Sequence, residues 1–426
     1  KLTNVGPSPS MELKLGERLN LLTGDNGLGK SFLLDIAWWS LTRKWPAEIN
    51  PRLSSGLMAR PMESGKGSIA FSFTAKVKPV SYVSVYDRKL QAWSGKVGRP
   101  SNPGLVLYAQ VDGSFALWDP ARNYWRMKGN IDVQDRPPAY VFSSRDVWNG
   151  LRDEERGLLC NGLISDWGGW QKERGRAFKS LCAVLAALSP SEGEKIVPGE
   201  LTRISLDDPR DIPTLVMPYG QSVPVLHASA GIRRIIALAY LLVWSWEEHL
   251  KASELLDQES TAQIVFLIDE IEAHLHPKWQ RRIVGALLSV MDTLAPNVNV
   301  QIVAATHSPL VLASAEAFFD AEKDAWFDLD CVSDEKNGVR VELKQRPFIR
   351  RGDVSNWLTS EAFDLESARS LEAERVLRDA AVALSDDAFD SHSARELDAR
   401  LRTVLGDTDP FWVRWRFIAE KKGWLS

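Results

Sequence analysis

Two adjacent carboxylates, Asp269 and Glu270, directly follow five apolar, largely β-branched residues at positions 264–268. Such a run predicts a buried strand, which would place both acids at its carboxyl end. One carboxylate could there hold Mg²⁺, while the other polarises the water that attacks a phosphate. A core strand that happens to end in two exposed acids would have the same sequence, so the pair alone leaves both interpretations open.

A second chemical stretch, GDNGLGKS at residues 24–31, matches the pattern G-x-x-x-x-G-K-S in full. A predicted strand at 19–23 precedes it and a predicted helix at 31–39 follows, which is the context that a phosphate-binding loop requires. Lys30 could bridge β- and γ-phosphate oxygens, and Ser31 could ligate Mg²⁺. A flexible glycine loop is the alternative. The candidate nucleotide-binding residues are Asn26, Gly27, Gly29, Lys30 and Ser31, and the metal candidates are Ser31 and Asp269.

Two further segments could face the same phosphates. SAGIRR at 229–234 opens a predicted helix, with Ser229 as N-cap and Gly231 permitting a close backbone approach, so a phosphate could bind at this helix end. A capped, buried helix would have the same sequence. His307 follows a predicted strand at 300–305, and open α/β sheets bind ligands at the carboxyl ends of their strands. We therefore expect His307 to contact a γ-phosphate.

The elements that must position these residues predict an α/β fold with two additions. Between the core segments, alternating residues at 67–74 and 82–86 and a hairpin with its turn at Asp112-Gly113 indicate antiparallel strands. Residues 151–190 and the tail are helical in pattern. The predicted domains are a core of residues 1–45 and 190–350, a β-rich insertion at 46–138, a helical subdomain at 139–189 and a helical C-terminal region at 351–426.

Composition limits the class of protein. With 426 residues, 44% of them hydrophobic, the chain can bury a large core. A net charge of −4 gives no overall basic field, which disfavours non-specific nucleic-acid binding by the whole surface but allows a local basic patch. Three unclustered cysteines favour a reducing, cytoplasmic compartment. The longest apolar run, 235–246, is too short to span a membrane, so we expect a buried helix and no membrane association.

Taken together, the stretches at 24–31, 229–231, 269–270 and 306–309 resemble the Walker A, signature, Walker B and switch-histidine elements of ABC-type ATPases, in the same order. More narrowly, DEIEAHLHP at 269–277 with the later THSP resembles the branch that contains RecF, the OLD family ATPases and phage-defence ATPases of the Septu and retron types.

This resemblance implies a P-loop fold of the ABC ATPase head type, with ATP and Mg²⁺ bound in a head-to-tail homodimer. ATP at Lys30 of one subunit would be completed by Ser229 and Gly231 of the other. Glu270 would act as catalytic base, Asp269 and Ser31 would hold Mg²⁺, and His307 would sense the γ-phosphate. Residues 271–274 would form a loop that crosses the dimer interface.

The sequence departs from this pattern in two places. The signature reads SAGIRR, not the transporter-like SGGQ, and the predicted strand at 139–142 is followed by two serines where a magnesium-contacting glutamine is expected. Gln110 lies in a predicted hairpin and Gln134 precedes the strand, so neither is predicted to fill that role. His274 and His276 lie near Glu272, but no ligand cluster converges there in sequence, and we expect these histidines to shape the interface loop.

The function that this set predicts is an ATPase that controls a separate effector, such as an HNH nuclease, in anti-phage defence. The alternatives are a RecF-like ATPase acting directly on DNA, an OLD-like ATP-driven nuclease, and a nucleotide-binding scaffold with little turnover. A TOPRIM nuclease needs a strand followed by acids, whereas Glu372 and Glu374 lie on a helical pattern. Arginines and tryptophans interleave at 412–416, which suits either a nucleic-acid or partner surface, or a solvated helix face over aromatic packing.

Overall fold

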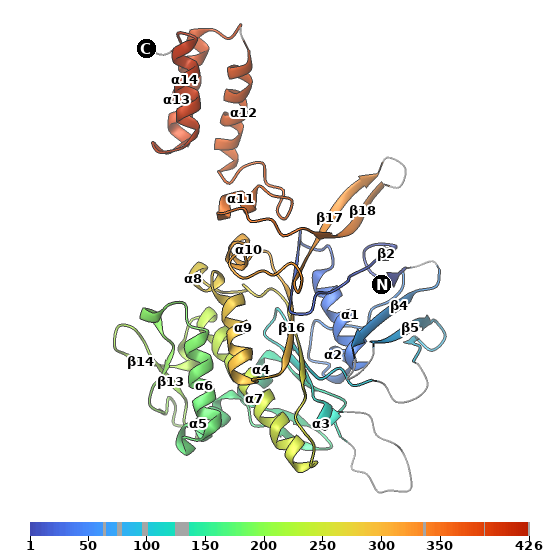
Figure 1. Cartoon of the computed structure of the whole chain (residues 1–426). Coiled ribbons are helices and arrows are strands. Elements are labelled where there is room, and N and C mark those ends of the chain that lie inside the picture. The colour runs from blue at the N-terminus through green and yellow to red at the C-terminus, as the bar shows by residue number, and fades with distance from the viewer. Residues whose placement is uncertain are drawn as a thin grey trace. The chain divides into compact units, whose positions relative to one another are not determined.

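The computed structural model describes residues 1–62, 65–74, 79–95, 101–123, 136–334, 338–386 and 388–424. The chain forms two units, Lys1–Arg350 and Arg351–Ser426, which are considered separately (Figure 1). Gln134 lies outside the described residues.

The first unit is built on an eight-stranded sheet of order β18-β17-β3-β16-β15-β7-β8-β9. Five neighbouring strands run parallel: β17 (Ala325–Asp334), β3 (Leu19–Gly24), β16 (Asn299–Ala305), β15 (Gln263–Ile268) and β7 (Leu105–Ala109). Antiparallel strands extend it at both edges: β18 (Gly338–Arg346), β8 (Phe115–Trp118) and β9 (Tyr140–Phe142). The central strands are apolar and buried along almost their whole length, as parallel strands covered on both faces must be.

Helices cover both faces of this sheet, with α1 (Lys30–Thr42) on one side and α7 (Ala230–Leu255) and α9 (Ile283–Leu294) on the other (Figure 1). The apolar run 235–246 is almost entirely buried within α7, which confirms the predicted buried helix. Short helices connect the larger elements: α2 (Pro46–Ile49), α3 (Pro120–Asn123), α8 (Pro277–Gln280), α10 (Pro309–Ala315) and the 3₁₀ turns Glu192–Glu194 and Val225–His227. Within the described residues, no helix is both long and apolar enough to cross a membrane.

The segment 46–138 contributes to two sheets. Its first strands join the amino terminus in a five-stranded antiparallel sheet: β2 (Ser10–Met11), β1 (Leu2–Thr3), β4 (Ser68–Thr74), β5 (Pro79–Asp87) and β6 (Ala92–Trp93). Its later strands, β7 and β8, belong to the main sheet, where β7 lies beside β15. Residues predicted as an insertion therefore form part of the sheet that carries Asp269.

Residues 139–224 combine helices with small hairpins. The helices predicted for 151–190 appear as α5 (Leu163–Glu173) and α6 (Arg176–Ala187), and a further helix, α4 (Ser144–Asn149), precedes them. The helix prediction is wrong for 151–160, which forms the hairpin β10 (Leu151–Asp153) and β11 (Gly157–Cys160), because the Asp153 carboxylate accepts backbone N–H groups within a tight turn. A three-stranded sheet follows: β12 (Val197–Pro198), β13 (Thr214–Val216) and β14 (Ser222–Pro224).

The second unit is helical, as predicted: α11 (Val354–Leu358), α12 (Leu371–Ser385), α13 (Ser391–Val404) and α14 (Phe411–Lys421). Its small core is formed by apolar faces of the last three helices, with Trp412, Trp415 and Trp424 all buried. Buried rings cannot stack on bases. The interleaved arginines and tryptophans are therefore a solvated helix face over aromatic packing.

Candidate functional site

The loop between β3 and α1 has the backbone of a phosphate-binding loop. Gly24, Gly27 and Gly29 all have positive φ, and a Cβ at Gly24 would collide with the Leu329 carbonyl group. At Gly27 no atom lies within 4 Å of a Cβ position, so this side of the loop is open. Helix α1 begins at Lys30, directly after the loop, which confirms the predicted strand–loop–helix order. The loop amides and the helix N-terminus can together bind an anion.

The Lys30 ammonium is held inside this loop. Its Nζ atom donates hydrogen bonds to the carbonyl oxygens of Gly24, at 2.7 Å, and Asp25, at 2.8 Å. Burial lowers the pKa of Lys30, while the nearby carboxylates of Asp269 and Glu270 act in the opposite direction. Lys30 therefore lies near both acids.

Asp269 and Glu270 follow β15, as predicted, and differ in environment. Asp269 is buried, and its Oδ1 atom makes no hydrogen bond of regular geometry with the described residues. Burial raises the pKa of Asp269, and the Ser31 hydroxyl and Lys30 oppose that rise. A buried carboxylate oxygen without a donor, next to a hydroxyl, fits a divalent cation such as Mg²⁺. Glu270 has a left-handed backbone with φ 45°, a strained conformation of the kind that clusters at functional sites.

His307 lies at the end of β16, the strand next to β15. Burial and the Lys30 charge lower the pKa of His307, which favours the neutral imidazole, although Glu270 partly opposes this shift. The same electrostatic interactions show that Lys30, Glu270 and His307 lie close together. One edge of the sheet thus collects the Walker A lysine, both Walker B acids and the switch histidine within a single chain.

The signature segment has different contacts. Ser229 is exposed and caps α7, its hydroxyl accepting from the Ile232 amide at 3.4 Å, which confirms the predicted N-cap. A Cβ at Gly231 would lie 2.6 Å from the carbonyl oxygen of His274. The loop after the Walker B strand therefore leaves no room for a side chain at position 231 of the same chain.

Gln110 is placed where the sequence did not predict it. The predicted hairpin of β7 and β8 is present, but β7 also runs parallel to β15, with Ala109 opposite Ile268. Gln110 therefore follows the strand next to the Walker B strand, at the same edge of the sheet. The expected strand, β9, lies two strands further out. The local hairpin signal that argued against Gln110 says nothing about parallel pairing with a strand distant in sequence, so the position of Gln110 beside the Walker B strand was not predicted.

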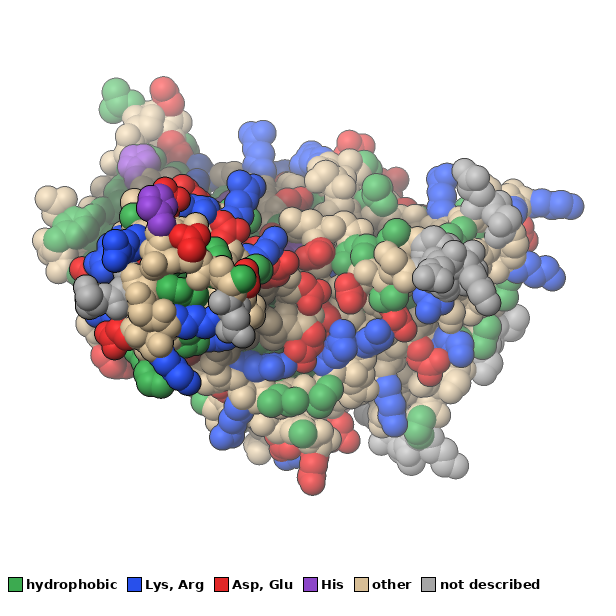
Figure 2. Space-filling view, turned by 90° about the horizontal axis from the view of Figure 1, so that it is seen from above, with side chains coloured by type: hydrophobic (Ala, Val, Ile, Leu, Met, Phe, Trp, Pro, Cys, Tyr) green, Lys and Arg blue, Asp and Glu red, His purple; other side chains and the backbone are tan. Residues whose placement is uncertain are grey.

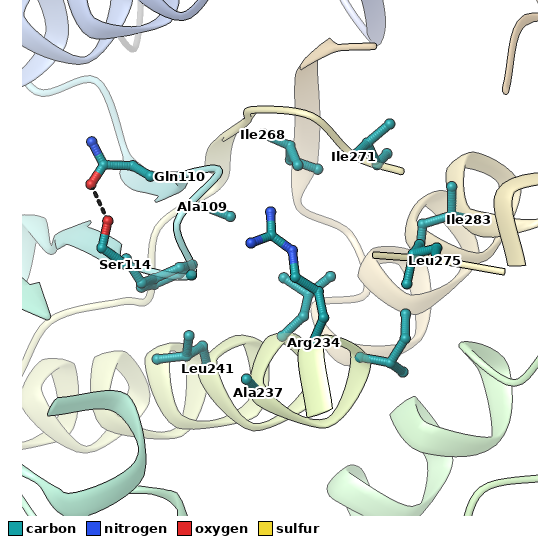
Figure 3. Close-up of a pocket in the computed structure, with 14 residues that line it drawn as sticks. Ala109, Gln110, Ser114, Arg234, Ala237, Leu241, Ile268, Ile271, Leu275 and Ile283 are labelled. Carbon is teal, nitrogen blue, oxygen red and sulfur yellow. Dashed lines mark hydrogen bonds between the residues drawn. The ribbon is translucent and has the colours of Figure 1, made fainter. Parts of the chain in front are cut away.

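Gln110 and Arg234 lie in one neighbourhood (Figure 3). Gln110 is buried, its Oε1 accepts from the Ser114 hydroxyl, and its Nε2 makes no hydrogen bond of regular geometry with the described residues. Arg234 donates to the carbonyl oxygens of Val111, at 2.9 Å, and Asp269, at 3.4 Å. Burial lowers the pKa of Arg234. The two residues line a largely apolar cavity of about 40 Å³ between α7 and the ends of β7 and β15.

Arg234 thus connects the signature helix to the strand ends that carry Gln110 and Asp269. The sequence contained this residue in SAGIRR, but spacing alone gave no signal that its side chain reaches back to the Walker B strand.

The two histidines after the Walker B acids have structural contacts. The Nδ1 atom of His276 accepts from the Lys278 amide at 3.3 Å and caps α8, while His274 is exposed with a left-handed φ of 62°. In the part of the chain that the structure describes, no three His, Cys, Asp or Glu residues form a metal-binding group.

A parallel sheet with a phosphate-binding loop before α1, paired acids after β15 and a histidine after β16 defines an ABC-type P-loop ATPase. The chain belongs to the family described as "AAA domain, putative AbiEii toxin, Type IV TA system", whose model matches residues 19–313, more than half of the chain.

Curated relatives agree with the narrower resemblance to Septu and retron ATPases. The chain is 21% identical over 323 residues to the Septu protein PtuA of Bacillus thuringiensis, a match that covers 74% of this chain and 72% of that protein. It is 24% identical over 187 residues to the "Retron Vc95 probable ATPase" of Vibrio cholerae serotype O1 biovar El Tor, covering 44% of this chain and 33% of that protein. A match to the "Retron Ec83 probable ATPase" of Escherichia coli, 28% identical over 148 residues, covers 34% of this chain and 22% of that protein.

The chain thus spans a third or less of the two retron proteins. Solved structures with some likeness include an SMC head bound to the C-winged helix domain of ScpA, with a TM-score of 0.40 and 14% identity, covering 81% of this chain and 96% of that one. The SMC head domain from Thermotoga maritima has a TM-score of 0.38 and 12% identity, covering 81% and 97%.

Proposed function

We propose that the protein hydrolyses ATP with Mg²⁺ and uses binding and hydrolysis to control a separate effector, a nuclease, in anti-phage defence. The observation that carries the ATPase part is the buried Asp269 carboxylate, whose Oδ1 atom makes no hydrogen bond of regular geometry with the described residues, at the sheet edge that also holds Lys30, Glu270 and His307. The relationship to the Septu protein, which extends over most of both chains, supports the defence role.

Each residue has a distinct task in this proposal. Lys30 exchanges its two loop carbonyl partners for β- and γ-phosphate oxygens, while the amides around Gly27 bind the remaining phosphate oxygens. Mg²⁺, when bound, supplies positive charge to the phosphates and would be held by Asp269 and Ser31. Glu270 orients the attacking water and accepts its proton.

Two further residues complete the phosphate side. His307 can donate a hydrogen bond from its ring to a γ-phosphate oxygen. Gln110, at the end of β7, provides an amide next to the Walker B strand, where it could hold a water molecule.

The second half of the site comes from another copy of the chain. Ser229 is exposed at the N-terminus of α7, and a helix N-terminus with free N–H groups favours a phosphate. In a head-to-tail homodimer, Ser229 and Gly231 of one subunit complete the ATP site around Lys30 of the other. Residues 271–274 would then lie at the interface, because the His274 carbonyl lies against Gly231 of the same chain.

The test of ATP hydrolysis is Glu270→Gln. Removing the base while keeping the shape should lower turnover by about 100- to 1,000-fold with little change in the affinity for a fluorescent ATP analogue. Glu259→Gln, an exposed acid outside the site, is the matched control and should behave as wild type. Unchanged turnover in Glu270→Gln would overturn the proposal and favour a binding scaffold.

The effector is proposed to be a separate protein. In the described residues of the second unit the secondary structure is helical, without the strand that a TOPRIM nuclease places before its acids. In the view of Figure 2, basic and acidic side chains are interspersed, which gives no support for a surface that binds DNA along its length. Purification from the native host, followed by identification of an ATP-dependent partner with nuclease activity, tests this point. A purified chain that cleaves DNA alone would contradict it.

A further inference from the structure

Glu272, two residues after the Walker B acids, connects its loop to the segment that carries the switch histidine. Its Oε2 atom accepts a hydrogen bond from the Thr306 hydroxyl at 2.7 Å, and its Oε1 atom accepts from the His307 backbone N–H at 2.5 Å. Both carboxylate oxygens are therefore bonded to two consecutive residues of one segment. Such a two-point contact fixes the position and the direction of that segment.

The partner segment is itself well anchored. Thr306 is fully buried, its N–H donates to the Leu22 carbonyl at 3.0 Å, and its hydroxyl oxygen accepts from the Ser308 N–H at 3.0 Å. The Thr306 hydroxyl must therefore use its single proton for Glu272. Nothing in this network reaches the His307 ring, so the carboxylate sets the ring position through the backbone.

The loop that carries Glu272 also contacts the signature segment. On one side, the Ile271 N–H donates to the Ala305 carbonyl at 3.1 Å, at the end of β16. On the other side, the His274 carbonyl lies against Gly231 at the start of α7. Residues 271–274 are thus in contact with the switch-histidine strand and with the signature helix of the same chain.

Burying a carboxylate at position 272 costs stability, which a contact that only joins two segments would not require. Burial raises its pKa, and the nearby Glu270 charge acts in the same direction, while the two donors from Thr306 and His307 oppose the shift. A partly buried acid close to a second acid destabilises a fold unless hydrogen-bond donors compensate it. A carboxylate offers two acceptor oxygens held in one plane, which matches the two donors.

We propose that Glu272 is a positioning residue: it holds His307 in place for the γ-phosphate and passes movement of the 271–274 loop at the dimer interface on to that histidine. The inference rests on the proposed function, because it requires His307 to act on ATP. It adds a connection within one subunit between the signature segment and the γ-phosphate contact.

The test is a double-variant cycle of Glu272→Ala and His307→Ala, read as turnover and as affinity for a fluorescent ATP analogue. Misplacing His307 should lower turnover in Glu272→Ala by roughly 30-fold and change affinity by less than about threefold. Because both changes remove the same contribution, the double variant should be no more than about threefold slower than His307→Ala alone.

Two more variants separate positioning from folding. Glu272→Gln keeps one acceptor for the His307 N–H and offers an amide to the Thr306 oxygen, so it should retain turnover within about fivefold. Thr306→Val removes one of the two contacts and should fall between Glu272→Gln and Glu272→Ala. If Glu272→Ala does not fold, the cycle is run with Thr306→Val and His307→Ala instead.

Independent effects would overturn the inference: turnover losses that multiply in the double variant, or wild-type turnover in Glu272→Ala. Its failure is distinguishable from failure of the proposed function. If Glu270→Gln abolishes turnover while the Glu272 and His307 effects multiply, only the positioning role is wrong. If Glu270→Gln hydrolyses ATP normally, the ATPase assignment itself fails.

Discussion

The two halves of the proposed ATP site are built differently. On the phosphate side, Lys30, Asp269 and His307 are charged or titratable, are buried or partly buried, and follow the ends of neighbouring strands. On the signature side, Ser229 is exposed and neutral, and Gly231, in the first turn of α7, lies against the His274 carbonyl. The phosphate side can therefore bind nucleotide within one chain. The signature side should matter for turnover and dimerisation far more than for binding.

Lys30→Ala is expected to have the largest effect. It removes a buried ammonium and its charge-assisted contacts to phosphate, about 3 kcal/mol, so ATP affinity should fall by at least about 150-fold. Lys44→Ala, an exposed lysine just beyond the same helix, should leave affinity unchanged. Titration of a fluorescent ATP analogue measures both. Near-normal affinity in Lys30→Ala would remove the basis for a distinct phosphate side.

Gln110→Ala tests whether the phosphate side also includes the end of β7. Loss of an amide beside the Walker B strand should lower turnover by about 30-fold while ATP affinity stays within a few-fold. Gln258→Ala, at an exposed position, is the control. Steady-state ATPase assays distinguish the two, and wild-type turnover in Gln110→Ala would return Gln110 to the role of a packing residue in a hairpin.

Gly231→Ala probes the signature side. The new methyl group would sit 2.6 Å from the His274 carbonyl, so α7 or the 271–274 loop must shift, and turnover should drop by about 10-fold with affinity retained. Gly169→Ala in α5 is the matched control, since nothing lies within 4 Å of its Cβ position. Gly169→Ala should leave the free energy of unfolding unchanged or raise it by up to about 1 kcal/mol. Equal behaviour of the two variants would contradict a tight contact at Gly231.

The smallest expected effect concerns Asp35, one turn along α1 from Ser31. Burial raises the pKa of Asp35 to about 7 from 3.8, although the Tyr108 hydroxyl donates to it at 2.9 Å. The folded state therefore binds a proton more tightly than the unfolded state. Its contribution to stability is complete below pH 3.8 and is lost as pH rises through 7.

Between pH 6 and 8, the free energy of unfolding of the wild type should fall by about 1 kcal/mol relative to that of Asp35→Asn, because the asparagine cannot titrate. Denaturant unfolding of the nucleotide-free protein at several pH values measures this difference. Asp407→Asn, an exposed acid in the second unit, should follow the wild-type profile. Parallel profiles for wild type and Asp35→Asn would show that Asp35 has an ordinary environment.

The sequence predicted those parts of the site that are contiguous in the chain. The loop around Lys30, the acids after β15, the N-cap at Ser229 and the histidine after β16 each have a local pattern that the structure reproduces. The four helices of the second unit were likewise visible in their periodicity.

The remaining parts depend on contacts between segments that are distant in sequence. Gln110 was excluded because its hairpin is local while its parallel pairing with β15 is not. Arg234 reaches the Asp269 carbonyl from another element, and Glu272 reaches the backbone of His307. Contacts of this kind, made by side chains between segments distant in sequence, leave no pattern of periodicity or composition in a single sequence. The strand pair β17 and β18 was not predicted, although residues 339–344 alternate apolar and charged side chains.

The central claim is that one ATP site is shared by two chains, and the most direct measurement is complementation. Lys30→Ala lacks the phosphate side, and Ser229→Glu places a negative charge where the signature side should meet the phosphate. ATP turnover is measured for each variant alone and for an equal mixture after subunit exchange. We predict that neither variant alone is active and that the mixture regains turnover, because a mixed dimer contains one intact site. A mixture as inactive as its components would contradict a shared site.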